Sequence, residues 1–339
     1  YRFDESDVKE FSMDLFKGGL YPTQEVFKYP KTGEDNSEVT LHLYDLKTKS
    51  TTDLKFEKDY EYFPRIKWFN EENPQLAIYG MNRHQNELDF VITNTDGSNR
   101  VLFTETDKYY IDVHDNLRYL DKQKSFVWTS EKSGYNHIYL KSLDGIETQI
   151  TNGDWEVTNF YGIDNQDYMY YSSNESGSIY STMYKMNLNS NLGKGSPMTK
   201  TNGTNNVTFS KGMKYYMNNY SDHKTPPYIT LHRTLDPDSV WGGLPSQEFW
   251  IYDTTDFNEP IETLEDNSDF NETLSEYNLS EKEFFTIQTE EGVELNAWMM
   301  KPTDFDVKKE YPLYMFLYGG PGSQVTDSWG WFNYFWYQH

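Results

Sequence analysis

The sequence predicts a mainly β fold, a partial β-propeller of four-stranded blades that is followed by the start of an α/β domain. Three observations support this prediction. Short aromatic-rich segments alternate with turn residues along most of the chain. An apolar position recurs with a period of about 48 residues. Near the C-terminal end, a continuously apolar segment runs into a glycine-rich turn.

Composition narrows the class of protein. The 339 residues are enough for two domains, and the net charge of −24 makes nucleic acids and anionic membrane surfaces poor partners. In the simplest interpretation the acidic surface serves solubility. The chain has no cysteine, which excludes disulfides, thiolate nucleophiles and cysteine metal sites. Aromatic residues make up 17% of the chain, with 29 tyrosines, and this composition favours β structure.

Short segments bounded by Gly, Asn, Asp and Pro are typical of strands in their length and residue types. The clearest are residues 38–45, 75–81, 88–94, 125–130, 137–142, 167–173, 214–220 and 248–253. Two connections, Asp96-Gly97 and Asp144-Gly145, have the chemistry of hairpin turns. The segments therefore pair as antiparallel neighbours.

The apolar repeat has equal spacing. Leu54, Leu102, Ile150 and Met198 follow one another at intervals of 48 residues. A period of this length, made of about four strands, indicates a β-propeller blade. A single blade cannot bury both of its faces, so blades stack side by side.

The pattern changes towards the C-terminal end. The Pro- and Gly-rich residues 222–247 predict a long loop or insertion, the strand pattern resumes at 248–253, and residues 271–280 predict a short helix or linker. From residue 281 the sequence predicts a hairpin and then a strand, within residues 311–318, that is apolar throughout. Such a strand is typical of an α/β sheet buried on both faces. We place a domain boundary near residue 280.

Two segments stand at this boundary: LEDNS at 264–268, and the run from FTIQTEEG to YGGPGSQ, which ends at Gln324. In these segments the chain resembles the dipeptidyl peptidase IV family, the prolyl oligopeptidase type of serine peptidases. Three propeller segments are also similar: KYPKTGEDNSEVTLHLYD at 28–45, WTSEKSGYNHIYL at 128–140 and ITNGDWEVTNFYGID at 150–164. The junction is the most specific part.

The resemblance implies an eight-bladed propeller that caps an α/β-hydrolase domain. Residues 1–280 would then be the C-terminal blades, and residues 281–339 the start of the peptidase domain. It also implies a serine exopeptidase that releases X-Pro or X-Ala dipeptides from peptide N-termini through a Ser-Asp-His triad. The family needs no cofactor, acts on peptides and commonly forms homodimers. A periplasmic, secreted or cell-surface bacterial location is expected by the same resemblance.

Tyr318 is the candidate catalytic residue. It stands immediately before Gly319, Gly320 and Gly322, where α/β-hydrolases place a loop that supplies an oxyanion donor. The residues alone leave two interpretations open, an oxyanion donor or an ordinary aromatic at a strand end. In the resembled family a tyrosine at this place donates its hydroxyl to the oxyanion, and this favours the first. The glycines are interpreted as support for the tight turn and not as catalytic groups.

Other candidate residues are given no catalytic role. The chain has no G-x-S-x-G elbow, so Ser323 is not a nucleophile, and the triad's Asp and His follow the serine in this fold. The seven histidines, among them His114, His137, His223, His232 and His339, are therefore interpreted as packing, loop or surface residues, and no zinc spacing occurs. The pairs Glu71-Glu72 and Glu290-Glu291 are interpreted as turn charges, and Arg118 is a weak candidate for substrate contact.

We expect the chain to be a piece of a longer protein. It begins at Tyr1 without Met and ends at His339 within an aromatic run. The nucleophile and the family's acidic pair for the substrate N-terminus would lie outside it, so the piece alone should be inactive. Two alternatives remain open: a non-catalytic propeller that acts as a binding module, and a tripeptidyl peptidase or other prolyl oligopeptidase relative.

Overall fold

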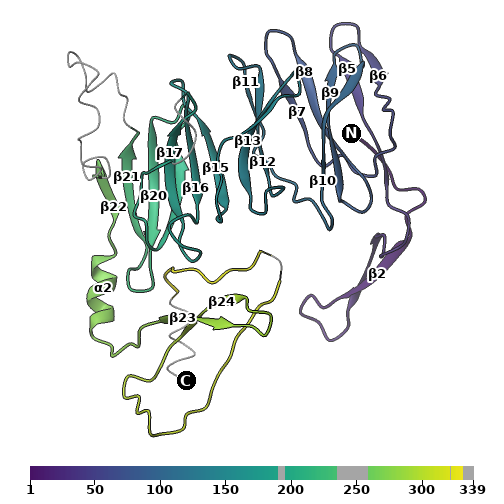
Figure 1. Ribbon diagram of the computed structural model, residues 1–339. Helices are drawn as coiled ribbons and strands as arrows, with labels where there is room; N and C mark the ends of the chain where they lie inside the picture. Colours follow the sequence, from purple (N-terminus) through teal and green to yellow (C-terminus); the bar gives the residue numbers. More distant parts are fainter. Residues whose placement is uncertain (190–194, 235–258, 321, 331–339) are drawn as a thin grey trace, which may run out of the picture. The chain divides into compact units, whose positions relative to one another are not determined.

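The computed structural model describes residues 1–189, 195–234, 259–320 and 322–330. The chain divides into two compact units (Figure 1). The first unit comprises Tyr1–Trp128 and Leu140–Glu147, and the second comprises Thr129–Tyr139 and Thr148–His339. Almost all regular structure is antiparallel sheet, as the sequence predicts. Within these described ranges, no helix is long and apolar enough to cross a membrane.

The first unit begins with three two-stranded pieces, which pair as β1 with β4, β2 with β3 and β5 with β6. Their bounds are Arg2–Asp4 (β1), Glu10–Leu15 (β2), Thr23–Lys28 (β3), Glu38–Thr40 (β4), His42–Asp45 (β5) and Ser50–Asp53 (β6). The predicted strand at 38–45 is therefore interrupted at Leu41. The carbonyl of Leu41 instead accepts the backbone N–H of Leu54, at 3.0 Å.

The next sheet of the first unit has the order β10-β9-β8-β7 (Figure 1). Its strands are Ile66–Phe69 (β7), Gln75–Met81 (β8), Glu87–Asn94 (β9) and Asn99–Thr106 (β10). The turn between β9 and β10 is the predicted Asp-Gly turn, in which Gly97 has a φ of 88°. A residue without a Cβ adopts this conformation without strain.

A second four-stranded sheet has the order β11-β12-β13-β14. Its strands are Arg118–Leu120 (β11), Ser125–Ser130 (β12), His137–Ser142 (β13) and Glu147–Gln149 (β14). The other predicted Asp-Gly turn joins its third and fourth strands, with a φ of 85° at Gly145. The two turns occupy the same place in successive sheets, as a repeat requires.

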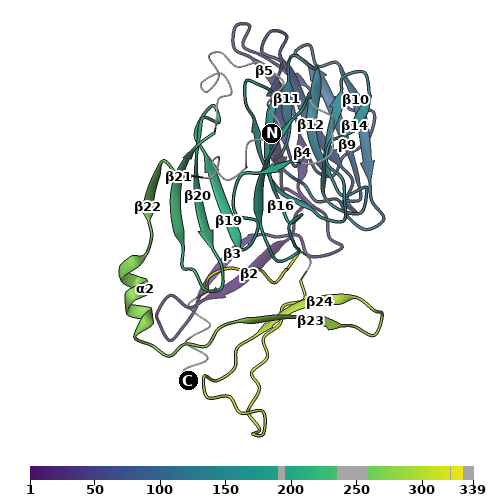
Figure 2. The ribbon, with the colours of Figure 1, turned by 60° about the vertical axis from the view of Figure 1, so that its left-hand side comes forward.

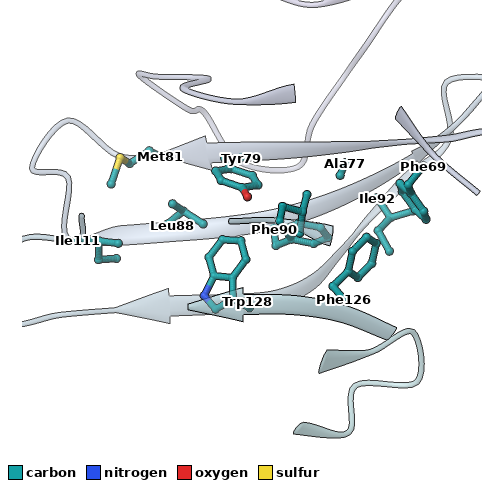
Figure 3. Packing of buried hydrophobic residues seen from close by; sticks show 11 residues of the cluster. Phe69, Ala77, Tyr79, Met81, Leu88, Phe90, Ile92, Ile111, Phe126 and Trp128 are labelled. Carbon is teal, nitrogen blue, oxygen red and sulfur yellow. The ribbon is translucent and has the colours of Figure 1, made fainter. Parts of the chain in front are cut away.

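Aromatic side chains fill the space between the sheets of the first unit (Figure 3). Phe90 of β9 is fully buried, and its ring centroid lies 4.9 Å from Phe126 and 5.7 Å from Trp128. Tyr79 of β8 lies 5.1 Å from Trp128. Edge-on ring pairs of this kind add about 0.5–1.5 kcal/mol each beyond their buried area. The stacking of sheets predicted from the repeat is present here.

The second unit contains two further four-stranded sheets, ordered β15-β16-β17-β18 and β19-β20-β21-β22 (Figure 1). The first has Val157–Ile163 (β15), Tyr168–Ser173 (β16), Thr182–Asn187 (β17) and Ser196–Pro197 (β18). The next has Thr204–Phe209 (β19), Tyr215–Ser221 (β20), Tyr228–Arg233 (β21) and Glu262–Glu265 (β22). Met183, Met198, Val207 and Tyr216 form a buried cluster drawn from both sheets.

The 48-residue repeat has a backbone counterpart. Met198 donates its N–H to the carbonyl of Met183, and Ile150 donates to Ile138, each at 2.8 Å. Leu54 donates to Leu41 in the same way. The fourth position, Leu102, instead lies where the pairing of β10 with β9 shifts register. At three of its four positions, the repeat therefore marks the residue directly after an outer strand, whose N–H bonds to the neighbouring part of the sheet.

One element contradicts the sequence prediction. The loop or insertion predicted for residues 222–247 contains a strand, β21, which pairs with β20 and β22. Pro226 and Pro227 precede the strand and do not interrupt it, so their missing N–H groups cost no ladder hydrogen bond. The predicted strand at 248–253 lies outside the described residues.

The helix and hairpin that follow the last sheet lie close to their predicted places (Figure 2). The helix α2 spans Ser268–Ser275, slightly before the predicted 271–280. The hairpin joins Glu283–Gln288 (β23) to Glu294–Met299 (β24) through a turn in which Gly292 has a φ of 83°.

Candidate functional site

The apolar segment before the glycine turn differs from its prediction. No regular structure is assigned between Tyr311 and Gly320, and the side chains from Leu313 to Tyr318 are exposed. A strand exists only through hydrogen bonds to its neighbours, and no described strand pairs with this segment. The predicted buried strand is therefore wrong for the described residues, although the segment has the composition of one.

Tyr318 lies at the end of this segment with 72% of its surface exposed. Its ring lies over the backbone of Gly320. A Cβ added to Gly320 would come within 2.5 Å of the ring, so any larger residue there would displace the tyrosine. Because the atoms met belong to the end of an exposed side chain, the ring can move away at little cost, and this contact alone does not require glycine at Gly320.

The other two glycines of the turn, Gly319 and Gly322, have different surroundings. Gly322 has a φ of 70°, a conformation that favours glycine, and Ser323 donates its N–H to the carbonyl of Gly320 at 3.2 Å. A Cβ at Gly319 would meet nothing within 4 Å, so the structure shows no steric need for glycine there. Pro321 lies outside the described residues.

The chain immediately after the turn is anchored at Asp327, which is only 5% exposed. Its N–H donates to the carbonyl of Ile179 at 2.9 Å, and its own carbonyl accepts the hydroxyl of Thr204 at 2.8 Å. Oδ1 of the carboxylate accepts the backbone N–H of His223 at 2.8 Å and lies 2.9 Å from ring Nδ1 of the same histidine. Because a carboxylate only accepts, Nδ1 carries the hydrogen in this bond.

These partners come from one end of two sheets. Ile179 lies between β16 and β17, Thr204 begins β19, and His223 lies between β20 and β21. A further bond joins the N–H of Trp329 to the hydroxyl of Ser221, at 3.3 Å. The segment without regular structure is thus held by strand ends of the second unit.

The hairpin β23–β24 and the residue before it also bind the segment that follows the glycine turn. Lys282 donates to the carbonyl of Ser328 at 3.0 Å, and Phe284 lies edge-on to the ring of His223 at 5.4 Å. Asn296 donates to the side chains of Ser178 and Gln324. Burial lowers the pKa of Lys282, and the negative charge of Asp327 opposes this effect.

The remaining candidate residues have structural surroundings. His137 is buried between Thr151 and the carbonyl of Gly153, as a packing histidine would be. Arg118 is exposed on β11 and donates to the carbonyl of Leu117. The pairs Glu71-Glu72 and Glu290-Glu291 are exposed. Across the ranges that the structure describes, no cluster of His, Asp and Glu has the geometry of a metal site.

Sequence reasoning missed the pairing of His223 with Asp327. The two residues are 104 positions apart, and neither belongs to a recognisable motif. His223 was interpreted as a loop histidine, and nothing in the sequence marks Asp327 among its 54 acidic residues.

Comparison with known proteins identifies the family. The sequence profile described as "Dipeptidyl peptidase IV (DPP IV) N-terminal region" matches residues 1–227. The chain belongs to the dipeptidyl peptidase IV family. Among curated members, dipeptidyl peptidase 4 of Arthroderma otae is 26% identical over 97% of this chain, and probable dipeptidyl peptidase 4 of Aspergillus flavus is 25% identical over 98%.

Solved structures of dipeptidyl peptidase IV type have the same fold. The crystal structure of Porphyromonas gingivalis dipeptidyl peptidase 4 matches 98% of this chain with a TM-score of 0.83 and 32% identity. A putative dipeptidyl aminopeptidase IV from Bacteroides ovatus matches 96% with a TM-score of 0.75 and 22% identity, which supports the fold alone. The chain spans 42% of the Arthroderma relative and 45% of the Porphyromonas chain.

Proposed function

We propose that this chain is part of a serine dipeptidyl peptidase, which releases X-Pro or X-Ala dipeptides from the N-termini of peptides. The observation that carries the proposal is the family match over residues 1–227. The chain covers less than half of its relatives, so the proposal concerns the full-length protein. The acyl-enzyme would form on a serine of a Ser-Asp-His triad outside this chain.

Tyr318 is assigned the role of oxyanion donor. Its ring is exposed, and it lies beside a glycine turn whose downstream end is anchored. A phenol in this place can donate to negative charge that develops on the carbonyl oxygen of a substrate. A preorganised donor of this kind contributes about 3 kcal/mol to transition-state stabilisation.

The division at residue 280 is part of the proposal. β22 ends at Glu265, and α2 then leads to the hairpin that starts at Glu283. Residues 1–280 are assigned to the propeller and residues 281–339 to the start of the α/β-hydrolase domain. The exposed apolar side chains from Leu313 to Leu317 support this division, because they have the composition of a strand that the rest of such a sheet would cover.

The activity is tested with the full-length protein and a chromogenic Gly-Pro substrate. We expect turnover of the substrate, labelling by a fluorophosphonate that reacts with activated serines, and loss of turnover once the protein is labelled. An N-acetylated form of the same substrate should not be cleaved, because an exopeptidase of this kind requires a free N-terminus.

The alternatives predict different results in the same assay. A tripeptidyl peptidase would release tripeptides from a longer peptide, as mass spectrometry would show. A protein with neither turnover nor labelling would be a binding module, and the peptidase proposal would be abandoned.

We also propose that the full-length protein is an exported or cell-surface homodimer, as expected from its resemblance to the family. Light scattering of the purified protein checks the dimer, and fractionation of the source cells checks the location. A monomer would contradict the proposed dimer, and a protein confined to the cell interior would contradict the proposed location. Neither result would bear on the proposed peptidase activity.

A further inference from the structure

We propose that Asp327 and His223 are positioning residues, which hold the glycine turn so that Tyr318 points towards the oxyanion. The proposal rests on the proposed function, because it names the contact through which the propeller orients this tyrosine. Neither residue touches the substrate or the reacting atoms. Their effect reaches the reaction through the backbone between residues 318 and 327.

The bonding of Asp327 differs from that of an ordinary turn carboxylate. Burying a carboxylate costs free energy unless hydrogen-bond donors compensate it. Oδ1 of Asp327 accepts two such hydrogen bonds, from the backbone N–H and the ring Nδ1 of His223. Both donors belong to His223, so the contact fixes the histidine backbone and its ring together. The bonds to Ile179 and Thr204 also fix the backbone of Asp327 on both sides. The residue is therefore a fixed point of the chain.

Tyr318 needs such a fixed point. Its side chain is 72% exposed, so packing does little to hold it. Glycine backbone has the widest conformational freedom, and the turn that follows Tyr318 contains three glycines. The direction of the phenol thus depends on where the chain is held beyond the turn. Gln324, through Asn296, and Asp327 are the first side chains after the turn with such contacts among the described residues.

The electrostatic surroundings of the pair support a permanent contact. Lys282 is the cation that faces Asp327 from the hairpin, and it donates to the neighbouring carbonyl of Ser328. Phe284 covers one edge of the His223 ring. Hydrogen bonds in such partly dry surroundings are stronger than those in water. The loop between β20 and β21 is therefore joined firmly to the segment after the turn.

The test uses the full-length enzyme and steady-state kinetics on the Gly-Pro substrate. A misplacement of about 1 Å can cost a hundredfold in rate. We expect Asp327→Ala and His223→Ala each to lower kcat by about ten- to a hundredfold, with KM changed by less than about threefold. The double variant should be no worse than either single variant, because the two residues act as one contact. Asp327→Asn, which keeps an oxygen for the His223 N–H, should recover part of the loss.

Two further variants separate positioning from general stability. Asp164 is the control. Its carboxylate accepts two backbone N–H groups and one side-chain hydroxyl, where that of Asp327 accepts one backbone N–H and one ring N–H, and these partners of Asp164 all lie between residues 166 and 170. Asp164→Ala should leave kcat unchanged. In a Tyr318→Phe background, Asp327→Ala should cause no further loss of kcat, because the group that Asp327 positions is already missing.

The outcomes are distinguishable. If Asp327→Ala and His223→Ala keep wild-type kcat while Tyr318→Phe does not, the positioning proposal is wrong and the proposed function stands. A further loss of kcat from Asp327→Ala in the Tyr318→Phe background would also overturn it, because the pair would then act by another route. If Tyr318→Phe itself keeps wild-type kcat, the role given to this tyrosine fails, and the positioning proposal fails with it.

Discussion

Tyr318 differs from the tyrosines that build the sheets. Tyr79, Tyr170 and Tyr216 are buried, and burial raises the pKa of each phenol above its usual value. Tyr318 is exposed at the end of an apolar segment. A phenol that is accessible and placed beside a tight turn can meet a substrate, whereas the buried phenols cannot.

At this scale we predict that Tyr318→Phe lowers kcat of the full-length enzyme by about a hundredfold and leaves KM nearly unchanged, because the lost hydrogen bond acts only in the transition state. Steady-state kinetics measure the effect. Tyr314→Phe is the control, since Tyr314 lies in the same segment with 66% exposure. An equal loss in both variants would point to a folding effect.

His232 provides a prediction about pH. It is 6% exposed, it stacks on Tyr216 at 4.7 Å, and its Nδ1 has no hydrogen-bond partner among the described residues. Burial lowers its pKa below the usual 6.5. The unfolded chain therefore binds the proton more readily, so the free energy of unfolding falls as pH drops below about 6.5.

Urea unfolding at pH 7.5 and pH 5.5 measures this effect. With an unfolded pKa near 6.5, the protonation of this one histidine can lower the unfolding free energy by at most about 1.4 kcal/mol between these two pH values. His232→Phe keeps the stacked ring and removes the titrating group, so its stability should depend less on pH. An unchanged pH dependence in the variant would assign the effect to other groups.

At the scale of elements, the strands were the most predictable part. Segments such as Gln75–Met81 and Ser125–Ser130 coincide with β8 and β12, because their residue types and bounding turns follow local rules. The sequence does not predict β21, because the many prolines around it indicate a loop. Its pairing with β20 and β22 makes it a strand, and this pairing is not visible in the local sequence. Contacts between distant segments, such as His223 with Asp327, leave no local signal.

The stacking of sheets predicts a large effect at Phe90. This side chain is fully buried, and four aromatic rings surround it: Tyr79, Phe103, Phe126 and Trp128. Phe90→Ala should lower the free energy of unfolding of the first unit by about 3–5 kcal/mol, because the cavity cannot collapse between two sheets. Urea titration followed by tryptophan fluorescence measures the change.

Leu46→Ala is the control for this cavity, because Leu46 is 83% exposed in a turn of the same unit. It should change the stability by no more than about 0.5 kcal/mol. A loss below about 1 kcal/mol for Phe90→Ala would mean that the aromatic cluster contributes less than its burial indicates.

At the scale of the whole molecule, the chain belongs to the dipeptidyl peptidase IV family and covers less than half the length of the relatives that it matches. The fold class and the family could be predicted from the sequence, since the blade repeat and the junction motif are both local patterns. The environment of Tyr318 could not, because it depends on where the backbone is anchored beyond the glycine turn. We propose that the serine which this tyrosine assists lies outside the chain.

We propose above that Tyr318 donates a hydrogen bond to the oxyanion of a peptidase reaction. A crystal structure of the full-length protein, with a phosphonate inhibitor bound covalently to the nucleophilic serine, tests it most directly. We expect the Tyr318 hydroxyl to lie about 2.7–3.1 Å from the phosphonyl oxygen that mimics the oxyanion. A hydroxyl turned away from that oxygen, with another donor in its place, would contradict it.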